Sequence, residues 1–428
     1  MSTKAEPSNK LTTGIHWLTV TAFCGAMNDN VFRWLMFGFL INIYDGKLTN
    51  PDILSMIGLV FAVPFLLFTA LGGNWADRFS KQKIIAWTKI SELIIMTLGT
   101  LAFLLETKIG VYCVLFLMCS QSAIFGPAKY AIIPELIDKT RLARANAQIE
   151  MVTYLAIIIG QIVGLSLWKT DSFLFSSIIC ISIAVIGILV SRYIPKTAAV
   201  GIIKKPSIIF FADIITTMQQ IKGLHKIRLI LCCAALFSLF AGFTQLNTIG
   251  FGEEILNMST DNSGYLFILA SLGIGLGSII AGRMCGKSIE ISLVPLGALG
   301  FSLSILFLGC ISPDNSNMVH FFGLNISGNI LLSCGSLALL GFFGGFYIVP
   351  LHTYIQYYAP KEKLGQTLAA MNFISWIGIL LAAGLNAYLN KNYSPAIAFK
   401  IIGVVTVIAA LFFATRQSIN LLRFAVCS

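Results

Sequence analysis

Residues 72–83 read GGNWADRFSKQK and form a short polar segment between two long apolar runs. The segment contains a glycine pair, then Asp77 and Arg78, then Lys81 and Lys83. In the whole chain 57% of residues are hydrophobic and 11% are charged, whereas about a quarter of the residues of a soluble domain are charged. In so apolar a chain, this segment indicates a cytoplasmic turn between two membrane helices.

The apolar runs on both sides of this turn, and further along the chain, have the length of membrane helices. About 20 apolar residues cross the hydrocarbon core as a helix, and each backbone polar group in lipid needs a partner within the protein. The first run is too long for the core of a signal peptide and is expected to remain as a helix. We predict an all-α membrane protein with twelve spans, at roughly 15–43, 53–72, 84–105, 109–131, 146–168, 173–194, 228–251, 263–282, 290–311, 328–351, 367–389 and 394–414.

The net charge of +11 is distributed as in a membrane protein. With the N-terminus inside, most Lys and Arg residues fall in the N-terminal tail and in the connections on the cytoplasmic side. The connections on the other side contain Lys47, Lys108, Lys169 and Lys391. Positive residues favour cytoplasmic loops, so both termini are predicted to be cytoplasmic, and no nucleic-acid partner is expected.

The longest cytoplasmic connection divides the chain into two halves. We predict a six-helix bundle over residues 1–194, a linker over 195–227, and a second six-helix bundle over 228–428 that ends in a short cytoplasmic tail. Paired halves of this kind place a substrate site at their interface near the membrane midplane.

Internal similarity supports the division into halves. The stretch GSIIAGRMCGK at 277–287 occupies the place in the second half that the polar turn has in the first, with Ala281 where Asp77 stands. Pro134 and Pro350 are each expected to end a helix, about half a chain apart.

The first helix contains four polar side chains about half-way across the membrane: Asn28, Asp29, Asn30 and Arg33. A charged side chain at that depth costs roughly 2.5–3.5 kcal/mol, so it is expected to face a cavity or a partner. Asp29 and Arg33 are four residues apart on one helical face and can partly neutralise each other. Two interpretations stay open, a structural ion pair and a contact for a polar headgroup or an ion.

The fourth helix is expected to break at residues 126–127, a Gly-Pro pair, just before Lys129 and Tyr130. A lysine beside a broken helix can anchor a phosphate, and an interfacial lysine is the alternative interpretation. On the next helix, Glu150 is positioned to pair with Lys129 or Arg144.

The polar turn itself suggests a gate. Asp77 can reach the N-terminus of the eleventh predicted helix, near 365–366, and hold the two halves together through the helix dipole. Arg78, Lys81 and Lys83 are expected to contact anionic lipid headgroups. Gly73, Asp77, Arg78, Lys81 and Arg144 are therefore the predicted gating residues.

Enzyme motifs are absent from the sequence. None of the four histidines is followed by Asp at the spacing of glycerolipid acyltransferases, and neither a P-loop nor a dinucleotide fingerprint occurs. The ten cysteines are scattered without a C-x-x-C pair and are expected to be small buried apolar residues. We predict a protein with no catalytic residues, no metal and no cofactor.

The turn at 72–83 resembles the signature loop of the major facilitator superfamily of transporters. Four further stretches resemble one branch of it, the bacterial lysophospholipid transporters and the transporter half of their fusions with 2-acylglycerophosphoethanolamine acyltransferase. They are GAMNDNVFRWLM at 25–36, FGPAKYAIIPELI followed by LARANAQIE at 125–150, AGRMCGKSIEISLVPLGALG at 281–300 and FYIVPLHTYIQYYAPKEKLGQTLAAMNF at 346–373.

The resemblance implies a lysophospholipid flippase that works by alternating access in the bacterial inner membrane. It would move lysophosphatidylethanolamine-type lipids to the inner leaflet, with Asp29, Asn30 and Lys129 as headgroup contacts. The resemblance also implies a separate acyltransferase as a partner, and a monomer is expected. Two other functions stay open: a proton-coupled exporter of drugs or small metabolites with Asp29 as the proton site, and a non-transporting membrane subunit that recruits an acyltransferase.

Overall fold

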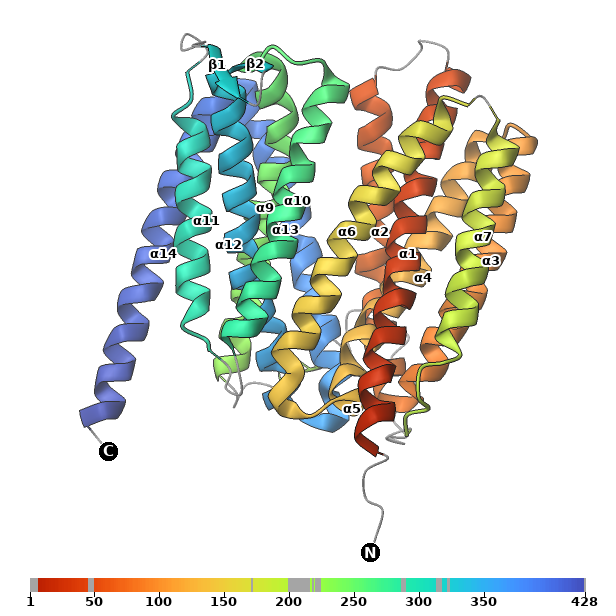
Figure 1. Ribbon diagram of the computed structural model, residues 1–428, viewed down its shortest axis with the longest axis horizontal. Helices are drawn as coiled ribbons and strands as arrows, with labels where there is room; N and C mark the ends of the chain where they lie inside the picture. Colours follow the sequence, from red (N-terminus) through yellow and green to blue (C-terminus); the bar gives the residue numbers. More distant parts are fainter. Residues whose placement is uncertain are drawn as a thin grey trace, which may run out of the picture. The chain divides into compact units, whose positions relative to one another are not determined.

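The computed structural model of the 428-residue chain describes residues 7–44, 50–170, 172–198, 216–217, 219, 225–285, 290–312, 318–321 and 324–426. The predicted linker lies largely outside these residues. The described chain is almost entirely helical (Figure 1), apart from an antiparallel pair of short strands, β1 (Met318–Phe321) and β2 (Leu324–Ser327).

Each of the twelve predicted spans overlaps one long helix. The short helix α5 (Ile133–Leu136) follows the fourth of them. The long helices are α1 (Pro7–Tyr44), α2 (Asn50–Arg78), α3 (Lys81–Leu104), α4 (Lys108–Ala131), α6 (Leu142–Trp168), α7 (Phe173–Ser191), α9 (His225–Glu254), α10 (Thr260–Met284), α11 (Leu293–Gly309), α12 (Gly328–Tyr358), α13 (Leu364–Asn392) and α14 (Pro395–Val426).

Length and composition make this a multi-pass membrane protein. Within the described residues, ten helices have at least 18 residues and are apolar enough to cross a membrane. The apolar helix α11 is shorter, with 17 residues. Many of the large apolar side chains on these helices, such as Leu101 and Ile408, are exposed, as expected where lipid replaces water as the solvent.

The helix break predicted at Pro127 and the helix end predicted at Pro350 are both wrong. α4 continues through Pro127, and α12 continues through Pro350. A proline inside a helix removes one backbone hydrogen bond, but the following residues Ala128 and Leu351 are fully buried. Packing of the turns beside each proline offsets the lost hydrogen bond, so the helices do not stop there.

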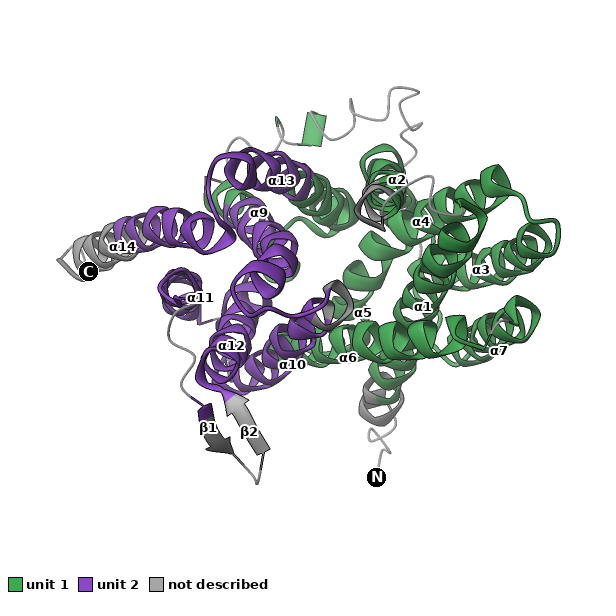
Figure 2. Cartoon of the chain, turned by 90° about the horizontal axis from the view of Figure 1, so that it is seen from above, with its two compact units in different colours: residues 1–232, 352–376 green, residues 233–351, 377–428 purple. Residues whose placement is uncertain are grey.

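The chain forms two compact units (Figure 2). Unit 1 comprises Met1–Cys232 together with His352–Trp376, and unit 2 comprises Cys233–Leu351 together with Ile377–Ser428. The last turns of α12 and the first turns of α13 therefore belong with the N-terminal helices. This assignment brings residues far apart in the sequence into one site.

In unit 1, α1 packs against α6 and α7, α2 packs against α4, and α3 packs against both α4 and α7. Aromatic side chains fill the space between them. The Phe103 ring lies 4.9 Å from the Phe39 ring and 5.3 Å from the Phe173 ring, measured between centroids. This apolar core fixes α1, which carries the predicted polar side chains, against α3 and α7.

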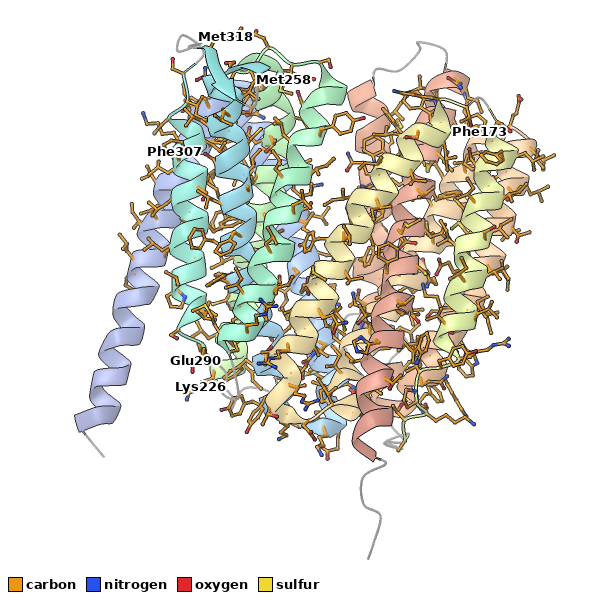
Figure 3. The ribbon with its side chains drawn as sticks, viewed as in Figure 1. Phe173, Lys226, Met258, Glu290, Phe307 and Met318 are labelled. Atoms are coloured by element: carbon orange, nitrogen blue, oxygen red, sulfur yellow. The ribbon has the colours of Figure 1, made fainter. Side chains whose placement is uncertain are left out.

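In unit 2, α11 packs against α14, and α10 meets α12 backbone to backbone. A Cβ atom on Gly277 or Gly341 would collide with a carbonyl oxygen of the facing helix, so only glycine fits there. Met258 and Met318 lie at one end of this unit and Glu290 lies at the other (Figure 3).

Candidate functional site

Half-way along α1, a polar face meets α4 and α2. The Asp29 Oδ2 atom accepts a hydrogen bond from Ser122 Oγ on α4 at 2.7 Å, whereas its Oδ1 atom is buried without a hydrogen-bond partner. Arg33 donates to Asn30 Oδ1 at 2.8 Å, and its guanidinium lies 5.6 Å from the centroid of the Phe61 ring on α2. Each side chain therefore has a different hydrogen-bond partner, so the structural ion pair that the sequence left open does not form as a direct contact, although the two opposite charges still attract each other.

The half-buried positions show which side of each helix is accessible. On α1, Asp29, Asn30 and Arg33 are half-buried, while Asn28 is fully buried. On α4, Ser122 and Lys129 are half-buried and lie seven residues apart, which places them on one face. The hydrogen bond between Asp29 and Ser122 joins these two polar faces.

Asn28 points away from this face and binds an ion pair inside unit 1. It donates to Glu92 Oε1 at 2.8 Å, and Glu92 Oε2 lies 2.6 Å from Lys89 Nζ. Both charged side chains are only 1% exposed. The absence of a side chain at Gly25 leaves room for the Lys89 ammonium, which lies 5.1 Å from the centre of the Phe125 ring.

Lys89 and Glu92 were not among the predicted site residues, although the sequence contains a signal for them. Two charges three residues apart within a predicted span carry the same insertion cost that drew attention to the first helix. Applied to the third helix, this rule would have marked both residues.

A second polar cluster joins α4, α6 and the last turns of α12. Tyr130 donates from its hydroxyl to Glu150 Oε1 at 2.5 Å, and the His352 ring stacks on the Tyr130 ring with 4.3 Å between centroids. His352 Nε2 lies 3.7 Å from Glu150 Oε1. The Lys129 ammonium also lies close to this group, 4.6 Å from the centroid of the Tyr130 ring.

The predicted pairing of Glu150 with Arg144 is wrong, because Arg144 is exposed and the Glu150 carboxylate accepts from the Tyr130 hydroxyl instead. Lys129 interacts electrostatically with Glu150 without a direct ion pair. A carboxylate beside a tyrosine hydroxyl receives a short hydrogen bond without the cost of burying a second full charge. His352 had no distinguishing sequence pattern, so its place in the cluster was not predictable.

One turn further along α12, two amide side chains bind each other. Asn146 Nδ2 donates to Gln356 Oε1 at 2.6 Å, and Gln356 Nε2 donates to Asn146 Oδ1 at 2.9 Å. Asn146 Nδ2 also lies 3.1 Å from Thr353 Oγ1, and Gln356 Nε2 donates to the Tyr130 carbonyl at 3.1 Å. This amide pair, with Thr353, connects α6 and α4 to the end of α12.

The predicted contact of Asp77 with the start of a later helix is confirmed. Its Oδ1 atom accepts from the Gly365 N–H at 2.6 Å and its Oδ2 atom from the Gln366 N–H at 2.9 Å, in the first turn of α13. These are N–H groups that a helix leaves unpaired at its start. A Cβ atom on Gly73 would lie 2.7 Å from the Gly365 carbonyl oxygen and would collide with Ala369, so glycine allows the close approach.

Two basic residues of the same turn have different surroundings. Lys81 is only 1% exposed and forms an ion pair with Glu135 of α5 at 2.5 Å, so the expected contact of Lys81 with lipid headgroups is wrong. Its side chain extends from the first residue of α3 into the protein. Arg78 is half-buried, and its guanidinium lies 5.9 Å from the centre of the Phe79 ring.

No cluster of three or more His, Cys, Asp or Glu side chains suited to a metal ion occurs within the described residues. A cavity of about 330 Å³ lies among α2, α3 and α4, lined by Trp75, Trp87 and Gln121 among others. Its lining includes none of the predicted site residues. The candidate site is therefore defined by the polar contacts of unit 1 rather than by this cavity.

The sequence profile of the Major Facilitator Superfamily matches residues 18–335 and 231–420. The chain belongs to this superfamily. It is similar to the lysophospholipid transporter LplT of Photorhabdus laumondii subsp. laumondii, with 26% identity over 399 residues that cover 90% of this chain and 91% of the relative. LplT of Escherichia coli O1:K1 is 24% identical over 380 residues, covering 87% of each chain. These relatives carry the name of the branch that the sequence motifs predicted.

Solved structures of the superfamily share the fold. The human organic anion transporter MFSD10 (TETRAN) has a TM-score of 0.73 at 14% identity, covering 94% of this chain and 99% of that chain. A single-residue variant of the Escherichia coli fucose:proton symporter FucP has a TM-score of 0.70 at 13% identity, covering 94% and 99%. The protein is an all-α membrane transporter of the major facilitator superfamily rather than an enzyme, as the sequence predicted.

Proposed function

We propose that this transporter moves lysophospholipids of the lysophosphatidylethanolamine type to the inner leaflet of the bacterial inner membrane by alternating access. The observation that carries the proposal is the similarity, along 90% of the chain, to proteins named as lysophospholipid transporters. An acyltransferase, as a separate protein, would restore the second acyl chain.

The proposed architecture has twelve spans and cytoplasmic termini, and the protein acts as a monomer. Residues 1–194 and 228–428 form the two six-helix bundles, and 195–227 connect them. The positions of the long helices and the placement of Lys and Arg in the even-numbered connections support this arrangement.

Asp29, Asn30, Arg33 and Lys129 form the proposed headgroup site. The unpartnered Asp29 Oδ1 atom can accept from the ammonium of an ethanolamine headgroup. Arg33 donates to an amide rather than to a carboxylate, so its charge is available to attract a phosphate. Lys129 supplies a second positive charge on the adjoining face of α4.

Three further predicted substrate-binding residues support these contacts. Asn28 holds α1 through Glu92, and Tyr130 and Glu150 hold each other beside Lys129. In the proposed gate, Asp77 and Gly73 make the contact with α13, and Lys81 fixes the start of α3 through Glu135. Arg78 is half-buried and Arg144 is exposed.

The test is transfer of labelled lysophosphatidylethanolamine across vesicles containing the purified protein. The wild type is expected to accelerate transfer over empty vesicles and Asp29→Ala to abolish the increase, while the matched control Glu253→Ala, an exposed acid at the end of α9, keeps it. Wild-type transfer no faster than in empty vesicles would reject the function. Full activity of Asp29→Ala would reject the site alone.

The unpartnered oxygen of Asp29 also favours a second candidate, a proton-coupled exporter of drugs or small metabolites. A buried carboxylate with a free acceptor is a proton-binding group in many transporters. This function requires transport of a soluble solute that depends on a pH gradient and is lost in Asp29→Asn.

A further inference from the structure

His352 stands in a position that the headgroup site does not use. It lies near the end of α12, within unit 1, and is 5% exposed. Its ring is held on two sides, by the Tyr130 ring at 4.3 Å and by the Glu150 carboxylate at 3.7 Å. The side chain is therefore fixed at the joint between α12 and the N-terminal helices.

The two ring nitrogens of His352 are both without a hydrogen bond. Nε2 lies 3.7 Å from Glu150 Oε1, too far for a hydrogen bond, and this oxygen already receives the Tyr130 hydroxyl at 2.5 Å. Nδ1 is buried and has no partner. A protonated imidazole has two N–H donors, and both need acceptors. The surroundings thus suit the neutral ring.

The charged and titratable groups facing the ring come from two helices. Tyr130 and Lys129 belong to α4, and Glu150 belongs to α6, where Tyr154 interacts with Glu150 rather than with the ring itself. Lys129 and Glu150 carry opposite charges, so a proton on His352 would add a second positive charge that this buried group does not balance.

The next turn of α12 also binds α4 and α6. Gln356 and Thr353 bind Asn146, and Gln356 also binds the Tyr130 carbonyl. Tyr130 therefore contacts both His352 and Gln356. His352 contacts the Tyr130 ring and Gln356 binds its carbonyl, so two successive turns of α12 are attached to the same residue of α4.

We propose that His352 is a proton-binding site that releases the end of α12 from α4 and α6. Protonation places an unsatisfied N–H donor in the buried site, adds positive charge beside Lys129, and brings Nε2 into competition with the Tyr130 hydroxyl for Glu150. Separation of the helices lets water solvate the imidazolium. The role of this release in transport, as the opening of the cytoplasmic end, rests on the proposed function.

Hydrogen exchange of the full-length protein in lipid nanodiscs measures the release. Protection of backbone amides in 352–364 is compared at pH 5.5 and pH 7.5, on either side of the ordinary histidine pKa of about 6.5, after correction for intrinsic exchange rates. If release raises the proton affinity of His352 tenfold, linkage lowers protection at the acidic pH by up to about tenfold. His352→Gln, which cannot titrate, is expected to show equal protection at both pH values.

Two further variants complete the test. Asn146→Ala removes the amide pair and should lower protection by the same factor at both pH values. Tyr130→Phe leaves Glu150 Oε1 free to receive the imidazolium and should reduce the acid-induced loss, which tests the proposal even if His352→Gln does not fold. The proposal is overturned if wild-type protection is equal at both pH values. It is also overturned if either His352→Gln or Tyr130→Phe keeps the pH response of the wild type. Because the measurement needs no substrate, absence of lysophospholipid transfer would reject the function and leave this site standing.

Discussion

Substitution of Asp77 by Asn removes the charge of the contact between α2 and α13 while keeping its size. The carboxylate accepts two backbone N–H groups, at 2.6 and 2.9 Å, whereas an Asn side chain has one acceptor oxygen. One hydrogen bond is lost and the other becomes a bond between neutral groups. The favourable interaction with the N-terminus of α13 is lost as well.

The size of the effect follows from these terms. A hydrogen bond to a charged group contributes about 1.5–3 kcal/mol and a neutral one about 1 kcal/mol. The lower cost of burying an amide offsets part of the loss, so the contact is expected to weaken by about 2–3 kcal/mol. The ratio of molecules without the contact to molecules with it should therefore rise about 30- to 150-fold.

Double electron–electron resonance can measure this ratio. Spin labels at Arg141 and Lys361, both exposed and both in unit 1, report the separation of α13 from the N-terminal helices in a chain whose ten native cysteines have been replaced. Asp77→Asn should add or enlarge a long-distance population. Glu106→Gln, which neutralises an exposed acid elsewhere in unit 1, is the control. Superimposable distance distributions for the wild type and Asp77→Asn would refute the reasoning.

Three further predictions concern the same unit. Gly73→Ala should enlarge the same long-distance population without any change of charge, because the added Cβ collides with Ala369; an unchanged distribution would mean that the backbones do not approach so closely. Glu92→Leu should lower the free energy of unfolding by about 3–5 kcal/mol in a thermal unfolding assay, because it leaves the Lys89 ammonium buried and unpaired. The double variant Lys89→Met with Glu92→Leu should recover most of this loss in the same assay. Gln356→Leu should weaken the contact of α12 with α6 more than Thr353→Val does. The reason is that three hydrogen bonds join Gln356 to Asn146 and Tyr130, whereas one joins Thr353 to Asn146. Equal hydrogen-exchange protection of residues 352–358 in the two variants would contradict this ranking.

The sequence was sufficient to predict the long helices, because an apolar run of membrane length has few other stable conformations. It also predicted the contact of Asp77 with α13, since the acid stands in a short polar segment between two apolar runs, although the segment is largely helical and Asp77 belongs to the last turn of α2. The two prolines were misleading. Pro127 and Pro350 lie inside helices because tertiary packing outweighs one missing hydrogen bond.

Other parts of the site depend on contacts that no local pattern reveals. Asn146 and Gln356 are 210 residues apart, and neither belongs to a motif that predicts pairing. The contacts of Asp29 and Arg33 were not predictable for a related reason. Helical spacing shows which side chains share a face, but not that Ser122 from α4 donates to Asp29 or that the Arg33 guanidinium lies over the Phe61 ring of α2.

In unit 1, the contacts among the helices of residues 1–194 differ in kind from the contacts that these helices make with residues 352–376. The fully buried ion pair of Lys89 and Glu92 lies on α3 and is bound by Asn28 of α1, so separation of these two helices would expose both charges. The joints with 352–376 instead use amides, a histidine, and a carboxylate bound to backbone N–H groups. Neutral hydrogen-bonding groups exchange protein partners for water at a net cost of only about 1 kcal/mol each, and each hydrogen bond to a carboxylate costs about 1.5–3 kcal/mol. Under the proposed alternating access, contacts of this second kind can open and close reversibly, whereas the ion pair keeps one bundle rigid while they do.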